Sequence, residues 1–153
     1  MNELLERLRD LDVVACVGTG GQPPSLGEFV ASGVAFAASS ERLENRYYQA
    51  LCELSDCIKP TAVTGSILHE GGPYHGCWLE STGTINTELL ARFLPAIATE
   101  TYSVFATHQR DDGLIPYKIT ENGPAFAQIQ LVTPLARSVW NHYCLNGRDR
   151  AFL

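Results

Sequence analysis

The sequence has no long hydrophobic run and no excess of basic residues, and both absences narrow the classes of protein to which it belongs. The 153 residues carry a formal net charge of −6, whereas non-specific binding to nucleic acid or to an anionic membrane needs basic patches. No stretch of about 18 apolar residues occurs, so no transmembrane helix is expected. The charged start MNELLERLRDLD lacks the basic and apolar segments of a signal peptide. We therefore expect a cytoplasmic protein that binds neither nucleic acid nor membrane.

The cysteines lack the spacing of a metal site or a disulfide framework. Their number is odd and no pair has CxxC spacing; they are Cys16, Cys52, Cys57, Cys77 and Cys144. Since disulfides are rare in the cytosol, we expect reduced thiols and no bound metal.

Common catalytic motifs are also missing. The sequence contains no GxSxG, no HExxH and no cysteine–histidine pair with supporting spacing. No motif therefore indicates a serine, cysteine or zinc hydrolase. We expect no metal or organic cofactor. What the chain does have is enough apolar sequence for a core, at 45% hydrophobic residues.

A glycine-rich segment near the start permits one alternative function. The apolar run Val13–Val17 leads into Gly18–Gly21, the outline of a phosphate-binding turn. However, Pro23 stands where a dinucleotide fingerprint needs a glycine, and Pro24 also obstructs the helix start that such a turn requires. A nucleotide-binding domain therefore remains a third hypothesis, and residues 1–40 are interpreted as a lead-in segment.

Hydrophobic periodicity predicts helices separated by long loops. Residues 41–58 have apolar positions at a 3.6-residue period and predict a helix that Pro60 stops. Residues 59–76 predict a loop with a short strand near 62–67. A second helix is expected from Thr87 to about His108, with a kink or a break at Pro95.

The C-terminal third predicts turns and one more helix. Leu114–Ile119 is expected to be extended, between turns at Asp111–Gly113 and Glu121–Pro124. A helix from residue 125 or 126 to Tyr143, kinked at Pro134, is then expected. Its predicted apolar face consists of Val132, Leu135, Ala136, Val139, Trp140 and Tyr143.

Four phrases in order resemble one known group of enzymes. They are WLEST at Trp78–Thr82, a phrase ending in DGLIP at Asp112–Pro116, an aromatic-rich helix, and GRDRAFL at Gly147–Leu153. The combination resembles the six-hairpin α/α-toroid glycosidases, which include trehalase-like, glucosidase-like and rhamnosidase-like enzymes. The resemblance implies a mainly α fold of antiparallel helical hairpins with long loops and a short β element. Residues 41–153 would hold about two hairpins of a toroid truncated at its C-terminus.

The resemblance also implies a carbohydrate site near residue 80. Glycoside cleavage usually needs two carboxyl groups, and in the resembled enzymes an aromatic-plus-acid stretch lines the pocket. Glu80 is the expected catalytic acid or base, and Trp78 the expected platform for a sugar ring. The remaining expected substrate-binding residues are Tyr74, His75, Glu121, Gln128 and Gln130. The structural alternative is that Trp78 belongs to the core and Glu80 caps the following helix.

Three functional hypotheses follow. The first is a glycosidase fragment that acts on carbohydrate through carboxylates, with weak or no activity expected if the fragment is all that exists. The second is a non-enzymatic helical module that binds a partner or a sugar. The third is the nucleotide-binding domain. Apolar helix faces left without neighbours in a partial toroid would favour self-association.

Overall fold

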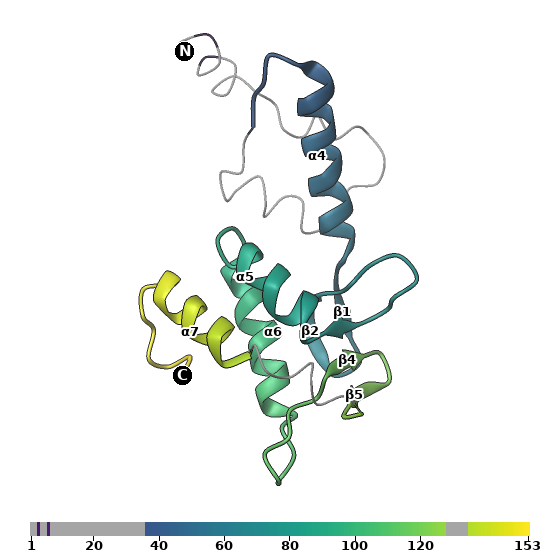
Figure 1. Ribbon diagram of the computed structural model, residues 1–153, viewed down its shortest axis with the longest axis vertical. Helices are drawn as coiled ribbons and strands as arrows, with labels where there is room; N and C mark the ends of the chain where they lie inside the picture. Colours follow the sequence, from purple (N-terminus) through teal and green to yellow (C-terminus); the bar gives the residue numbers. More distant parts are fainter. Residues whose placement is uncertain (1–2, 4–5, 7–35, 128–134) are drawn as a thin grey trace. The chain divides into compact units, whose positions relative to one another are not determined.

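The computed structural model describes Glu3, Glu6 and residues 36–127 and 135–153 (Figure 1). The chain forms two compact units, Met1–Asp56 and Cys57–Leu153. The predicted glycine-rich turn at 18–21 lies outside the described residues. The expected boundary at residue 40 stays a prediction.

The described part of the first unit contains α4 (Glu41–Asp56), which confirms the helix predicted over residues 41–58. The segment before it is held by side chains of the helix: the Tyr48 hydroxyl accepts from the backbone N–H of Phe36 at 2.9 Å and donates to its carbonyl at 2.8 Å. Glu44 Oε1 accepts from the N–H of Ala38 at 2.8 Å. Tyr48 and Glu44 are therefore buried, whereas Leu43 of the predicted apolar stripe is exposed.

The second unit begins with a hairpin of β1 (Ile58–Thr61) and β2 (Thr64–Leu68), which pair antiparallel. The sequence predicted mostly loop here, with one short strand. The β-branched residues around the turn favour extended backbone, and pairing satisfies the N–H and C=O groups that a loop would leave to water. On β2, the N–H of Gly65 donates to Glu100 Oε1 at 2.7 Å and so ties the hairpin to a later helix.

A second antiparallel sheet has the strand order β3-β4-β5. The strands are β3 (Cys77–Trp78), β4 (Lys118–Thr120) and β5 (Gly123–Ala125). The predicted extended segment at 114–119 overlaps β4. By contrast, Ala125 was expected to begin a helix and instead ends a strand, because β5 pairs with β4 across the Glu121–Asn122 turn.

Helical structure follows β3 without a long loop. The π-helical turn η1 (Ser81–Asn86) continues into α5 (Thr87–Leu90), and α6 (Pro95–Thr107) follows after a break. The break occurs at the expected proline. Pro95 disfavours helical backbone angles at Leu94, the residue before it. Pro95 itself is the first residue of α6, a position at which the backbone N–H has no partner within the helix, so its absence has no cost. The last helix is α7 (Leu135–Leu145).

α6 lies at the centre of the second unit, in contact with β2, α5 and α7 (Figure 1). Gly83 of η1 approaches it so closely that a Cβ there would lie 2.8 Å from the Phe105 ring. The buried core takes residues from β2, β3, α6, β4 and α7 and from the segments next to them. They are Ile67, Cys77, Leu79, Ala91, Ala98, Tyr102, Val104, Phe105, Ile119 and Leu135.

The expected fold class is wrong. The second unit is a small mixed α/β domain with two antiparallel sheets, and not part of an α/α toroid. The predicted helical hairpins fail for a physical reason. Segments that were expected to be plain loops pair as strands, and the helix expected from Thr87 to about His108 is divided into α5 and α6. The kink expected at Pro134 lies outside the described residues. Self-association was expected through the uncovered helices of a partial toroid, and the described fold is not a toroid.

None of the helices in the described part of the chain is long and apolar enough to cross a membrane.

Candidate functional site

Three of the predicted site residues border one small hollow. Its lining is Glu70, Tyr74, Trp78, Glu80 and Ser81, and its volume is about 260 Å³. We call it the aromatic hollow. The lining comes from the loop between β2 and β3, from β3 and from the start of η1.

Glycines in the loop before β3 shape one side of the hollow. Gly71 and Gly72 have φ angles of +88° and +55°, which L side chains rarely adopt, and the N–H of Tyr74 donates to the Gly71 carbonyl at 3.1 Å. The N–H of Glu70 donates to the carbonyl of Gly76 at 2.8 Å. These bonds close the loop on itself and bring Glu70 and Tyr74 toward β3.

The two aromatic rings have different surroundings. Their centroids are 6.1 Å apart at an interplanar angle of 86°, so the edge of one ring meets the face of the other. Lys118 of β4 lies opposite Trp78 in the sheet, and its Nζ is 4.9 Å from the centroid of the indole. Trp78 is half-buried, whereas Tyr74 is 64% exposed. Tyr74 therefore offers the more open ring, although the sequence favoured Trp78 as the platform.

The two carboxylates of the hollow also differ. Glu70 Oε1 accepts a hydrogen bond from the hydroxyl of Ser81. The Glu80 carboxylate is exposed and makes no hydrogen bond or ion pair with the part of the chain that the structure describes. Glu80 does not cap η1 through its side chain, contrary to the structural alternative. Its oxygens are thus available to a ligand.

The remaining predicted site residues do not line the hollow. His75 is exposed, and Glu121 is exposed in the turn between β4 and β5. Gln128 and Gln130 lie outside the described residues. Their assigned roles stay predictions.

Sequence analysis missed Glu70, Ser81 and Lys118 as neighbours of Trp78. Ser81 directly follows Glu80, so a search around that residue would have included it. Nothing in the spacing indicates Glu70 or Lys118, because the Gly76 contact and the β3–β4 pairing bring them there.

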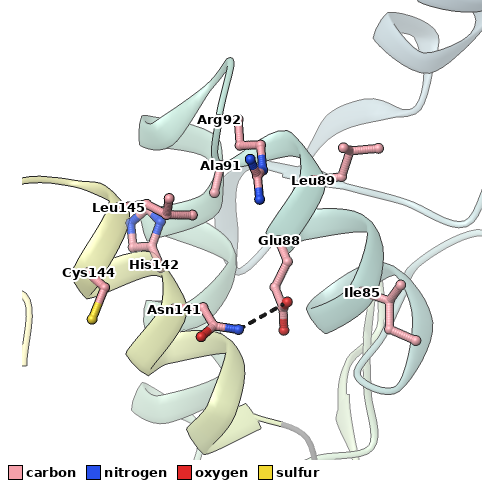
Figure 2. A pocket seen from close by; sticks show the side chains of 9 residues that line it. All are labelled: Ile85, Glu88, Leu89, Ala91, Arg92, Asn141, His142, Cys144 and Leu145. Atoms are coloured by element: carbon pink, nitrogen blue, oxygen red, sulfur yellow. Dashed lines mark hydrogen bonds between the residues drawn. The ribbon is translucent and has the colours of Figure 1, made fainter.

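A larger cavity of about 490 Å³ lies between α5 and α7 (Figure 2). We call it the helix cavity; its lining includes Ile85, Glu88, Leu89, Arg92, His142 and Leu145. No residue of this cavity was a predicted site residue.

Glu88 joins α5 to α7 across the helix cavity. Its Oε1 accepts from Arg137 Nη2 at 3.2 Å and from the Ser138 hydroxyl, and its Oε2 accepts from Asn141 Nδ2 at 3.3 Å. Burial alone would raise the pKa of Glu88, but the bonds from Ser138 and Asn141, together with the Arg137 guanidinium, lower it below its usual value. The carboxylate is therefore charged and already supplied with donors.

His142 is a buried residue of α7 that also lines the helix cavity. Its Nε2 is 2.8 Å from the Thr99 hydroxyl and its Nδ1 is 2.8 Å from Asn146 Nδ2. Burial lowers the pKa of His142, so the neutral ring is favoured. The predicted apolar face of α7 is therefore partly wrong: Ser138 and His142 are buried, while Trp140 is 57% exposed.

Among the described cysteines, Cys52, Cys77 and Cys144 are free thiols. Cys77 is fully buried, and burial raises the pKa of its thiol. Among the residues that the structure describes, no group of three or more histidine, cysteine, aspartate or glutamate side chains is arranged to hold a metal ion.

Comparison of the chain with models of protein families, with curated proteins and with solved structures found no match. The resemblance to six-hairpin glycosidases therefore stays an interpretation of the sequence motifs.

Proposed function

We propose that this protein binds carbohydrate at the aromatic hollow. The observation that carries the proposal is the convergence of Tyr74, Trp78 and Glu80 with a second carboxylate, Glu70, on one hollow. Aromatic rings pack against the C–H faces of sugars, and carboxylates and hydroxyls accept or donate hydrogen bonds to sugar hydroxyl groups. The lining supplies each of these groups within a short stretch of chain.

The size and openness of the hollow favour a single sugar unit. Its volume of about 260 Å³ falls just below the usual range of roughly 300–1,000 Å³ for small-molecule sites. A shallow site that buries little of its ligand gives weak binding. We therefore expect recognition of one residue of a glycan, with affinity gained from Tyr74 stacking and Glu80 hydrogen bonds.

Tryptophan fluorescence tests this proposal directly. The sequence has two tryptophans, so Trp140→Phe leaves Trp78 as the sole reporter. In that background, titration with a panel of methyl glycosides and short oligosaccharides should change the Trp78 emission for at least one sugar. No response to any sugar of the panel, with the fold intact by circular dichroism, would contradict the proposal.

Variants then separate the hollow from non-specific effects. Tyr74→Ala should weaken saccharide binding about tenfold or more, since it removes the open ring and with it roughly 1.4 kcal/mol or more. Glu80→Gln should weaken binding by less, since the amide keeps one acceptor. Glu41→Gln, an exposed glutamate of α4, is the matched control and should leave binding unchanged.

Glycoside hydrolysis is the second candidate, favoured by the two carboxylates that border the same hollow. One would protonate the leaving oxygen and the other would act as base or nucleophile. Glu80 is the better proton donor candidate because its oxygens are not engaged by the described residues. Glu70 is positioned by Ser81.

Hydrolysis of a panel of aryl glycosides tests this second candidate. If Glu80 is the general acid, Glu80→Gln should lower the rate about 100-fold or more. Equal, nonzero rates for the two proteins would remove Glu80 from the mechanism. Binding without hydrolysis would leave the carbohydrate-binding module as the function.

A further inference from the structure

The helix cavity contains a cation without a partner. Arg92 follows α5, and its guanidinium points into the space between α5 and α7 (Figure 2). The guanidinium makes no hydrogen bond or ion pair with any residue in the described part of the chain. An arginine held at the lining of a cavity presents a fork of N–H donors that suits a carboxylate.

The nearby carboxylate does not cancel this charge. Glu88 is already paired with Arg137 at 3.2 Å and also accepts from Ser138 and Asn141. Arg137, which is not part of the lining, offsets the charge of Glu88, so the guanidinium of Arg92 is the unpaired charge at the cavity. One positive charge suits a monoanion and does not suit a polyphosphate.

The walls around Arg92 are mainly aliphatic. Leu89, Leu145 and Ile85 all line the cavity, and they are 61%, 51% and 60% exposed. Three large aliphatic side chains gathered at one cavity are more than the scattered exposed apolar residues of an ordinary surface. They provide a surface against which an apolar ligand body loses water.

The polar atoms of His142 are not available to a ligand. Its two ring nitrogens are engaged by Thr99 and Asn146, and the ring lies 4.9 Å from Phe152 and 5.4 Å from Tyr102 between ring centroids. The imidazole therefore contributes a ring face or edge to the lining, and not a hydrogen bond. Arg92 remains the charged group that a ligand can reach.

From this arrangement we propose that the helix cavity binds a small organic carboxylate with an aliphatic body, its carboxylate on Arg92 and its apolar part against Leu89, Leu145 and Ile85. The volume of about 490 Å³ lies within the roughly 300–1,000 Å³ typical of small-molecule sites. This site is separate from the aromatic hollow and does not depend on carbohydrate binding.

Three ligands of equal length and different charge test the proposal. Hexanoate, hexanol and hexylamine are titrated into the full chain, and binding is followed by ¹H–¹⁵N NMR shifts. Hexanoate should bind with its largest shifts at residues 85–92 and 141–145, about tenfold more tightly than hexanol, since a charged hydrogen bond contributes roughly 1.5–3 kcal/mol. Hexylamine should bind no more tightly than hexanol.

Substitutions at the cation separate charge from apolar packing. Arg92→Gln should weaken hexanoate binding about tenfold and leave hexanol binding unchanged, and Arg92→Lys should retain the preference for hexanoate. Leu89→Ala should weaken both ligands. Arg42→Gln, an exposed arginine of α4, is the matched control and should change neither.

Two results would overturn the proposal. One is equal affinity for hexanoate and hexanol, or no binding of hexanoate, by a chain whose amide spectrum is that of the folded protein. The other is undiminished hexanoate binding by Arg92→Gln. Because Arg92 is exposed and unpaired, that variant is expected to fold, and its amide spectrum verifies this.

Discussion

The aromatic hollow is lined by two glutamates and the helix cavity by one, and Glu80 of the hollow and Glu88 of the cavity have opposite roles. Glu88 accepts hydrogen bonds from three residues of α7 and is part of the structure that holds the helix pair together. Glu80 is exposed, and its carboxylate has no partner in the described part of the chain. The comparison teaches that a carboxylate whose bonds are all used stabilises the fold, while one without partners is available to a ligand.

The same contrast applies to the cations. The ammonium group of Lys118 lies over the Trp78 ring and so has an aromatic partner, whereas the guanidinium of Arg92 has no partner among the described residues. We therefore infer neutral, hydroxyl-rich ligands for the hollow and an anionic, aliphatic ligand for the cavity.

The largest loss of stability is expected from Phe105→Ala. Phe105 is fully buried in the core and touches Gly83 of η1, the segment that runs from the hollow to the cavity. Removing the ring should lower the free energy of unfolding by about 3–5 kcal/mol, measured by urea denaturation. A loss below 1 kcal/mol would mean that η1 does not depend on α6, and that the two sites do not share this support.

Isosteric changes of the two glutamates should differ in their effect on stability. Glu88→Gln should lower the free energy of unfolding by about 1–2 kcal/mol, because the amide cannot accept at both oxygens and loses the charge opposite Arg137. Glu80→Gln should change it by less than about 0.5 kcal/mol. If urea denaturation gave a similar loss in the free energy of unfolding for both variants, Glu88 would not stabilise the fold more than Glu80 does.

The pH dependence of stability tests whether the charged form of Glu88 stabilises the folded protein. The pKa of Glu88 is lowered in the folded protein, so its contribution is present above the unfolded value of about 4.3 and is lost as the pH falls through the folded value. The stability difference between the wild type and Glu88→Gln should therefore shrink as the pH is lowered below about 4. A difference that is constant with pH would show that the carboxylate is not the stabilising form.

The pKa of His142 should be lower in the folded protein than in the unfolded chain, because the ring is buried. Because its pKa is lowered in the folded state, the unfolded chain binds more protons, and stability should fall as the pH drops below about 6.5. An NMR titration, with His142→Gln to assign the signal, should place its midpoint below that of a free histidine. A midpoint at or above about 6.5 would contradict the buried, neutral ring.

The smallest effects are expected in a cross-test of the two sites. Arg92→Gln should leave saccharide binding unchanged, and Tyr74→Ala should leave hexanoate binding unchanged, since neither residue lines the other site. Fluorescence and NMR titrations of both variants with both ligands measure this. If either variant weakened both ligands, the hollow and the cavity would be coupled or the effects would be general.

Local sequence determined several features. The 3.6-residue period and acidic start of residues 41–56 produce α4, because helix hydrogen bonds and the helix dipole act within a few residues. Pro95 fixed the break before α6 through its own ring and missing N–H. Tyr74, Trp78 and Glu80 were predicted together because they are only a few residues apart, so a turn and a short strand suffice to group them.

Only the tertiary structure decided the fold class, the second carboxylate of the hollow and the whole helix cavity. Strand β3 has only two residues, too few to show an alternating pattern of apolar and polar residues. It is a strand because it pairs with β4, about forty residues later in the sequence, and this pairing places Lys118 opposite Trp78. Likewise, Glu88 meets Arg137 and Ser138 only because α5 and α7 pack on the same helix. Contacts of this kind depend on which distant surfaces bury each other, and a pattern of neighbouring residues does not contain that information.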